Sequence, residues 1–190
     1  MNPVSSHVFR RSIRLLPVAA LSMALAACAG HATQVLPAMT TTPAGTAVKQ
    51  PAPQLYVAGQ PAEADWRAFA AAGVGTVINL RTTGEMKGRD ARAEVAAAGM
   101  RYLELPIDGA AAVTPENARR LGELLRDARG PVLVHCASGN RVGGLLALLK
   151  ASEGMPAEQA LDFGRSAGMT STEAKVRDTL GVAPAAQAAP

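Results

Sequence analysis

Residues 132–143 read VLVHCASGNRVG, an apolar run followed by small and polar residues and then by the start of an apolar helical pattern. The run 132–135 predicts a buried strand, and the residues from Arg141 onward predict a helix. At such a junction, backbone N–H groups and the positive end of the helix dipole converge on one point and favour a bound anion. The residues of the predicted anion-binding loop are Ala137, Ser138, Gly139, Asn140 and Arg141.

Cys136 lies at the start of this loop. A helix N-terminus stabilises a thiolate and lowers the pKa of a cysteine, so Cys136 is predicted to be a nucleophile. Gly139 permits backbone angles that larger residues resist, and the guanidinium of Arg141 offers a planar fork to a bound oxyanion. The alternative is that Cys136 is a buried structural cysteine in a strand-to-helix turn. The only other cysteine is Cys28, so no disulfide framework is expected.

The rest of the domain shows short apolar runs that alternate with helical patterns. Besides 132–135, we expect strands at 55–58, 76–80 and 102–107. We expect helices at 62–72, 89–98, 114–128, from 141 onward, at 156–167 and at 172–180. This alternation predicts an α/β domain with a parallel sheet between helices. Because ligands bind beyond the carboxyl ends of parallel strands, functional residues are expected just after Leu80, Ile107 and His135.

The first 27 residues have the features of an export signal. The basic residues of this segment are Arg10, Arg11 and Arg14. Residues 15–27 follow as an apolar run that is too short to span a bilayer. The run ends in LAAC, which resembles the bacterial lipobox, so residues 1–27 are predicted to be a lipoprotein signal peptide and Cys28 the lipidated residue. An ordinary signal peptide is the alternative.

The predicted lipid on Cys28 would attach the protein to the bacterial cell envelope, at the periplasmic face of a membrane. Residue 29 is Ala rather than Asp, which by resemblance to the sorting rules of Gram-negative lipoproteins favours the outer membrane. Residues 28–53 are rich in Ala, Thr, Pro and Gly without apolar periodicity, which predicts a disordered tether. Residues 182–190 predict a disordered tail. The folded domain is therefore expected at 54–181.

The net charge argues against binding of nucleic acid, and the positions of the histidines argue against a metal site. The chain has 19 Lys and Arg against 15 Asp and Glu; without the three arginines of the export signal, 16 basic residues remain, a net charge of about +1. A protein so close to neutral has no electrostatic footprint for nucleic acid. The histidines other than His135 are His7 and His31, outside the predicted domain, so no metal site and no cofactor are expected.

Four stretches resemble the dual-specificity type of cysteine phosphatase, and above all its bacterial phosphatase-like relatives found alone or beside β-lactamase-like hydrolases. The stretches are LYVAGQP at 55–61, GVGTVINLR at 73–81 with Glu85 after it, GMRYLELPID at 99–108 and GPVLVHCASGNRVG at 130–143. They occur in the order and spacing of that family and cover about residues 54–170. The resemblance implies a four-stranded parallel sheet of order 1-4-2-3 between helices.

The resemblance also implies roles for particular residues. Cys136 would attack the phosphorus of a phosphomonoester of unknown class and form a thiophosphate intermediate, while Arg141 would hold the equatorial oxygens. Asp108, at the end of the third expected strand, is the candidate general acid for the leaving oxygen. Asp108 also precedes Gly109, and Asp-Gly is a common turn sequence, so a plain turn residue is the alternative.

Further polar residues follow the expected strands. His135 could hydrogen-bond around the loop and support the thiolate, or could be a buried polar residue of the core. Arg81 and Glu85 could line the site, or could simply pair with each other at a separation of four residues.

The sequence departs from the phosphatase pattern at two points. Four residues separate Cys136 from Arg141, where those phosphatases have five, and Val142 stands where they have Ser or Thr. The four-residue spacing is that of rhodanese sulfurtransferases, whose upstream motifs are missing here. Sulfur transfer and a noncatalytic anion-binding lipoprotein therefore remain as alternative functions.

Overall fold

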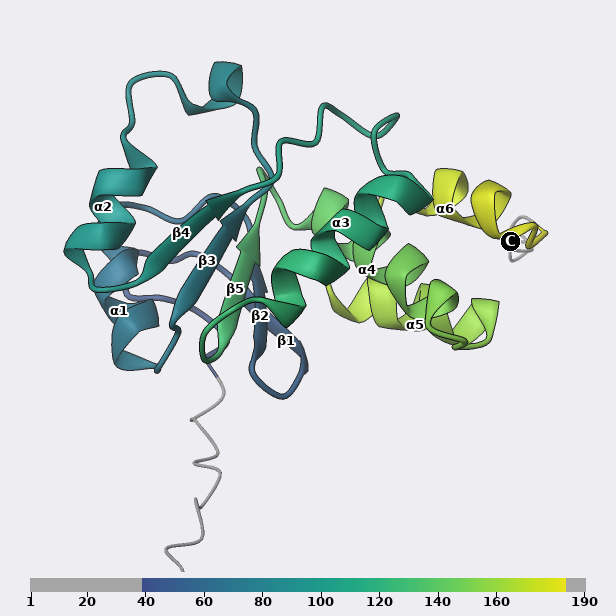
Figure 1. The fold of residues 1–190 in the computed structure, drawn as a ribbon, viewed down its shortest axis with the longest axis horizontal. Helices are drawn as coiled ribbons and strands as arrows, with labels where there is room; N and C mark the ends of the chain where they lie inside the picture. Colours follow the sequence, from purple (N-terminus) through teal and green to yellow (C-terminus); the bar gives the residue numbers. More distant parts are fainter. Residues whose placement is uncertain (1–38, 184–190) are drawn as a thin grey trace, which may run out of the picture. The chain divides into compact units, whose positions relative to one another are not determined.

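The computed structural model describes residues 39–183 and shows a single five-stranded sheet with helices on both faces (Figure 1). The strands are β1 (Val48–Ala52), β2 (Leu55–Ala58), β3 (Thr76–Asn79), β4 (Arg101–Glu104) and β5 (Val132–His135). Their order across the sheet is β1-β2-β5-β3-β4. The last four pair in parallel, so the expected parallel order 1-4-2-3 is confirmed. The fifth strand, β1, pairs with β2 in the antiparallel direction.

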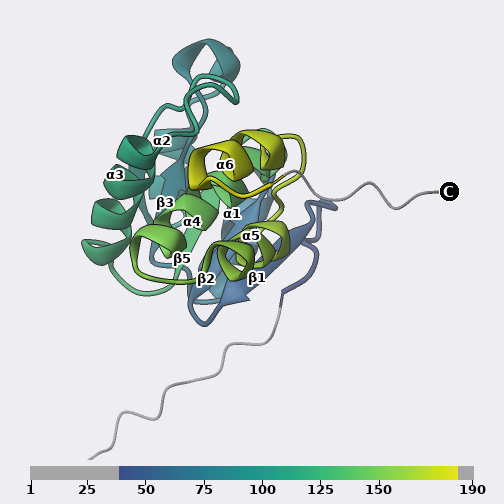
Figure 2. The ribbon, with the colours of Figure 1, turned by 90° about the vertical axis from the view of Figure 1, so that its right-hand side faces the viewer.

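The helices form two layers on the sheet (Figures 1 and 2). One layer consists of α1 (Asp65–Ala71) and α2 (Ala91–Ala97). The other consists of α3 (Pro115–Arg126), α4 (Asn140–Ser152), α5 (Ala157–Ser166) and α6 (Glu173–Leu180). A short 3₁₀ turn, η1 (Thr83–Met86), which was not predicted, precedes α2. Among residues 39–183, no helix has the length and apolar character needed to cross a bilayer.

Successive strand residues supply the two cores, because side chains alternate between the faces of a sheet. Val77 and Leu133 point toward α1 and α2 and pack with Trp66. Ile78 and Val134 point to the opposite face and pack beneath α3 and α4. Both layers cover the central strand, so all four residues of β5 are buried and its sequence is apolar rather than alternating.

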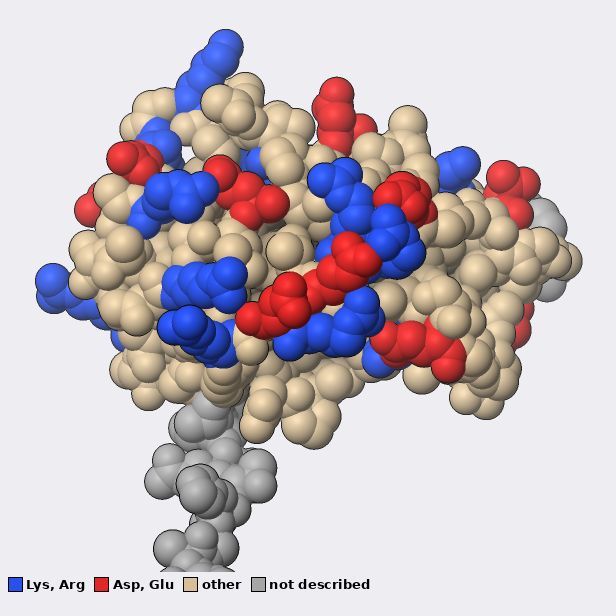
Figure 3. All heavy atoms as spheres, in the orientation of Figure 1, with Lys and Arg blue, Asp and Glu red and all other residues tan. Residues whose placement is uncertain are grey.

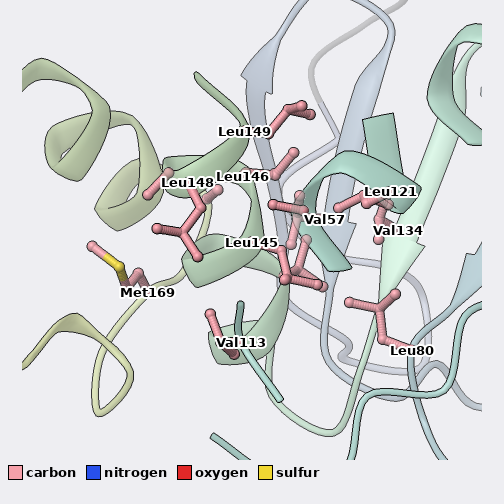
Figure 4. Packing of buried hydrophobic residues seen from close by; sticks show 14 of the residues in the cluster. Val57, Leu80, Val113, Leu121, Val134, Leu145, Leu146, Leu148, Leu149 and Met169 are labelled. Carbon is pink, nitrogen blue, oxygen red and sulfur yellow. The ribbon is translucent and has the colours of Figure 1, made fainter. Parts of the chain in front are cut away.

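Helix α4 lies in the middle of the larger core. Every residue from Arg141 to Leu149 is buried, and Figure 4 shows Leu145 and Leu146 among Leu121, Val57 and Val134. Gly143 allows the chain that follows α5 to cross at backbone distance, because a Cβ on Gly143 would overlap the backbone nitrogen of Met169. The helix is therefore held on both sides, and its N-terminus points at the carboxyl edge of the sheet.

Strand β1 corrects the predicted domain boundary, because it lies inside the segment 28–53 assigned to the tether. An edge strand is held through backbone hydrogen bonds, and in β1 only Val48 is buried, so no apolar period marked it. The buried carboxylate of Asp65 also ties this region down, since it accepts hydrogen bonds from the backbone N–H of Ala44 (3.1 Å) and the hydroxyl of Thr46 (2.7 Å). Burial acts to raise the pKa of Asp65, but these hydrogen bonds, with others from Thr42 and Ala62, outweigh it and leave the pKa lowered.

The other predictions for the two ends of the chain concern segments that the structure describes only in part. The signal peptide 1–27 and Cys28 lie outside the described residues, as do 184–190 of the predicted tail. The first two tail residues continue the fold: the backbone N–H of Val182 donates to the carbonyl of Arg177 (3.0 Å), whose guanidinium donates to the carbonyl of Ala183 (2.9 Å). The folded domain therefore extends at both ends beyond the predicted range 54–181.

Gly143→Ala is expected to lower the free energy of unfolding by about 1–3 kcal/mol, because the new methyl group meets backbone that cannot rotate away. Urea unfolding measures the loss. Gly122→Ala is the matched control within a helix, since its new methyl group would meet only the end of the flexible Leu149 side chain. Equal losses in the two variants would show that the close approach at Gly143 is not rigid.

Candidate active site

The predicted anion-binding loop connects the central strand to the buried helix. β5 ends at His135, and α4 begins at Asn140 after Gly139, whose φ of 88° lies in the left-handed region that glycine adopts readily. The backbone N–H of Gly139 turns back and donates to the Sγ of Cys136 (3.1 Å). This hydrogen bond holds the sulfur against the turn at the start of α4.

Two neighbouring segments hold the loop in place. On one side, the backbone N–H of Gln60 donates to the carbonyl of Ala137 (3.2 Å). On the other side, Oδ1 of Asn140 accepts hydrogen bonds from the backbone N–H of Thr170 (2.8 Å) and from the hydroxyl of Thr172 (2.9 Å). The side chain of Asn140 is thus engaged in structure, and only its backbone N–H could contribute to the predicted anion site.

Arg141 is anchored by Glu85, a residue far away in the sequence. Its Nη1 donates to Oε2 of Glu85 (2.9 Å) and to the carbonyl of Ile107 (2.6 Å), and its Nη2 donates to Oε1 of Glu85 (2.6 Å). A guanidinium has five N–H donors. The Nε–H and the second hydrogen of Nη2 therefore remain, and these two lie on one edge of the planar group. Glu85 holds the arginine and leaves a two-donor fork for an oxyanion.

This pair shifts the pKa of both partners. The hydrogen bond from Arg141 is the largest cause that lowers the pKa of Glu85 to about 2. The pKa of Arg141 is raised, first by the hydrogen bond with Glu85 and, against burial, by the charge of Cys136. Arg141 is only 8% exposed, and a buried guanidinium is costly without a partner. The carboxylate therefore allows a permanent positive charge to lie beside the sulfur.

Arg81 supports the same arrangement from outside the loop. Its Nη2 donates to the backbone carbonyl of Glu85 (2.7 Å), and its Nη1 donates to Oε1 of Gln60 (2.8 Å). The ion pair between the side chains of Arg81 and Glu85 is longer, at 3.6 Å. The carboxylate of Glu85 therefore binds Arg141 more closely than Arg81. The pairing of Glu85 with Arg141 was not predicted from the sequence. Thr82 and Glu85 form a capping box on η1. The spacing T-x-x-E is the sequence signal from which this turn could have been predicted.

The position of Asp108 agrees with both interpretations of the sequence, a candidate general acid near the loop and a turn residue before Gly109. It is exposed and precedes Gly109, whose φ of 64° marks a turn. It also lines a hollow of about 370 Å³ together with Glu85 and Arg141. Figure 1 shows the loop after β4 and the loop that carries η1 at the same edge of the sheet. Asp108 therefore borders the same hollow as the arginine.

His135 fits the second of its two predicted roles, a buried polar residue of the core. It is fully buried, with its ring centroid 5.8 Å from that of Trp66, and neither ring nitrogen has a hydrogen-bond partner among the described residues. The alternative role, a hydrogen bond from the ring that supports the thiolate, has no well-formed counterpart among the described residues. Burial is the main cause that lowers the pKa of His135 to about 3, so the ring is neutral near pH 7 and adds no positive charge to the site.

Other charged and polar groups contribute less. On the face seen in Figure 3, basic and acidic residues are interleaved. Among the surface ion pairs of the domain are those of Arg119 with Glu116 (2.8 Å) and of Arg92 with Glu104 (2.7 Å). Such exposed pairs contribute about 0–1 kcal/mol each. Within residues 39–183, no three His, Cys, Asp or Glu side chains are grouped so that they could hold a metal ion.

Sequence comparison matches the site to one family. The sequence model of the beta-lactamase hydrolase-like protein, phosphatase-like domain, matches residues 47–153, which include β1 and all the site residues above. A beta-lactamase hydrolase-like protein of Agrobacterium fabrum is 33% identical over 120 residues, 60% of this chain and 28% of that protein. One from Xylella fastidiosa is 34% identical over 105 residues, 53% of this chain and 24% of that protein. The chain thus spans about a quarter of the length of these relatives.

Solved structures share the fold. A provisionally assigned phosphatase of Neisseria meningitidis has a TM-score of 0.61 at 22% identity, over 69% of this chain and 96% of that one. Another from Shewanella putrefaciens has a TM-score of 0.54 at 25% identity, over 70% and 88%. A kinase-associated phosphatase, crystallised with its catalytic cysteine replaced by serine, has a TM-score of 0.52 at 19% identity, over 77% and 100%.

In Glu85→Gln, the free energy of unfolding is expected to fall less steeply with decreasing pH than in the wild type. The folded pKa of about 2 lies below the ordinary value of 4.5, so ionised Glu85 contributes stability that is fully present above pH 4.5 and is lost as the pH falls toward 2. Urea unfolding at a series of pH values should therefore show a steeper fall for the wild type than for Glu85→Gln. Glu63→Gln, at an exposed position, is the control, and equal slopes in all three proteins would contradict the anchoring role of Glu85.

Proposed function

This chain belongs to the family of phosphatase-like domains of beta-lactamase hydrolase-like proteins, and on that premise we propose that it hydrolyses a phosphomonoester through a covalent intermediate on Cys136. The family and the structural neighbours support a phosphatase-type function in general. The mechanism is argued from the site. The observation that carries it is the arrangement of Arg141: Glu85 and Ile107 engage its other N–H groups and leave the Nε–Nη2 edge free, and the guanidinium interacts with the charge of Cys136.

In the first step, the thiolate of Cys136 attacks phosphorus, the S–P bond forms and the bond from phosphorus to the leaving oxygen breaks. The carboxylic acid of Asp108 gives its proton to that oxygen, so an alcohol departs. The free edge of Arg141 and the backbone N–H groups of the loop bind the other phosphate oxygens, where negative charge gathers in the transition state. Because Glu85 and Ile107 hold the guanidinium in advance, little reorganisation is needed.

In the second step, water attacks the thiophosphate, the S–P bond breaks and the carboxylate of Asp108 takes a proton from the water. Inorganic phosphate leaves and the thiolate returns. In the phosphatases that this sequence resembles, a Ser or Thr after the arginine stabilises the departing thiolate; here that position holds Val142, which is buried in the apolar core. We therefore infer that the second step is the slower one and that the thiophosphate accumulates.

The cellular setting is a further part of the proposal. The basic and apolar residues of 1–27 and the Cys28 that follows lie outside the described residues, and their sequence supports export and lipidation. We propose that a lipid anchor on Cys28 holds the domain at the periplasmic face of the cell envelope, on the outer membrane. The phosphorylated substrate would then be one that is present in that compartment.

Cys136→Ser is expected to abolish hydrolysis of p-nitrophenyl phosphate by the full chain, because a serine hydroxyl at neutral pH is not ionised and cannot replace the thiolate. Release of p-nitrophenol measures turnover, and rapid mixing of the wild type should show a burst before the slower steady state. Cys28→Ser, which removes the other cysteine, is the control that keeps activity.

Two results would redirect the assignment. Formation of thiocyanate from thiosulfate and cyanide, with no hydrolysis of phosphate esters, would favour the rhodanese-type alternative. Phosphate binding without turnover in the wild type would favour the noncatalytic anion-binding alternative.

Asp108→Asn is expected to slow hydrolysis of phenyl phosphate by about 10²–10⁴-fold, because its leaving oxygen needs a proton. The difference is expected in kcat/KM, which reports the first step: kcat/KM for p-nitrophenyl phosphate should fall less, since p-nitrophenolate departs unprotonated, and the variant should still bind phosphate analogues. Steady-state kinetics on the two esters measure this difference. Asp178→Asn makes the same change on the exposed side of α6 and serves as control. Full activity of Asp108→Asn on phenyl phosphate would remove Asp108 from the mechanism.

A further inference from the structure

A second hollow flanks the loop on the side away from Asp108. Its volume is about 280 Å³. It borders the first half of the loop, Ala137 to Gly139, whereas the hollow that contains Asp108 borders the second half, Asn140 and Arg141. The remaining walls come from the start of β1 and from the end of β2 with the turn that follows it. A molecule whose phosphate occupies the loop can therefore extend into either hollow.

Lys49 is the only charged side chain that lines this second hollow. It lies on β1, opposite Val57 of β2, and its stem runs beside the loop. A Cβ built on Gly168 would be 3.4 Å from Cδ and Cε of Lys49 and 3.5 Å from the carbonyl carbon of Gly139. The lysine stem and the loop backbone thus pack against the same glycine.

The ammonium group of Lys49 has no ion-pair partner within residues 39–183. Two of the other polar side chains of the hollow, Thr46 and Gln60, are already engaged, whereas the hydroxyl of Ser138 on the loop makes no hydrogen bond within residues 39–183. The hydroxyl of Thr46 donates to Asp65 (2.7 Å), and Gln60 donates to the carbonyl of Pro61 (3.0 Å) and accepts from Arg81 (2.8 Å). The unmet hydrogen-bonding capacity of the hollow is therefore that of a cation with three donors on β1 and of one hydroxyl on the loop.

We propose that this hollow is a subsite for a second oxyanion of the substrate, a carboxylate or a phosphate, which the ammonium group of Lys49 binds while the first phosphate lies in the Cys136 loop. The proposal rests on the proposed phosphatase function and narrows its substrate class to phosphomonoesters that carry another negative group. Arg141 cannot hold that second group, because Glu85 and the first phosphate occupy its donors. An exposed ammonium group attracts such an anion with a strength that falls as salt is added.

Calorimetric binding to the full-length Cys136→Ser chain tests the subsite without turnover. The probes are propyl phosphate, propane-1,3-diol bisphosphate and 3-phosphooxypropanoate, with the two- and four-carbon analogues of each. At low salt, the best-fitting ligand with a second anion should bind about fivefold more tightly than its matched alkyl phosphate. Whether the bisphosphate or the carboxylate gains more tells which oxyanion the subsite prefers.

The same measurement in Lys49→Gln, on the Cys136→Ser background, should abolish the advantage of the second anion, and Lys49→Arg should retain it. Lys175→Gln removes an equal charge from the exposed side of α6 and should also retain it. An advantage that persists in Lys49→Gln, or is missing at every linker length, overturns the proposal. If propyl phosphate itself does not bind, the proposed function falls as well; if it binds without any gain from a second anion, only the subsite falls.

Discussion

The architecture depends on the way α4 is held between the sheet and the chain after α5. Nine successive residues of α4 are buried, so its packing neighbours fix the position of the helix. Backbone contact at Gly143 with the segment around Met169 further prevents the helix from shifting. Its N-terminus therefore meets the end of the central strand at a set distance. The loop between them must turn sharply, which the positive φ of Gly139 permits. The convergence of Cys136, the Gly139 N–H and Arg141 follows from this constraint.

The electrostatics of the site follow from burial. A guanidinium this deep in the protein needs hydrogen-bond acceptors, and Glu85 with the carbonyl of Ile107 supplies them. The same burial keeps His135 neutral. The positive potential at the sulfur therefore comes from one arginine, the loop N–H groups and the helix dipole rather than from an imidazolium. The short spacing of four residues between Cys136 and Arg141 makes this fixed arginine more important, because fewer loop N–H groups are present to share the charge of a phosphate.

The two hollows beside the loop are lined by different charged residues. The hollow with Asp108 contains the carboxyl group that can exchange a proton with a leaving oxygen, whereas the hollow beside β1 contains a cation and no acid. Strand β1 is thus more than an addition to the sheet edge, since it supplies a charged group beside the Cys136 loop. The curated relatives are about four times as long as their match to this chain.

The sequence by itself determined what depends on neighbouring residues. The apolar run before Cys136, the small loop residues and the arginine five positions later predicted the strand, the anion loop and the clamp, because a single turn of backbone brings them together. The alternation of apolar runs and helical patterns predicted the α/β class, and the family resemblance implied the parallel order. Only the tertiary structure decided the contacts between distant segments. Glu85 and Arg141 are 56 residues apart, β1 pairs through a backbone that shows no side-chain period, and the isolation of His135 arises from packing against Trp66. Such contacts depend on how separate elements pack against one another, and no local pattern of residues encodes that.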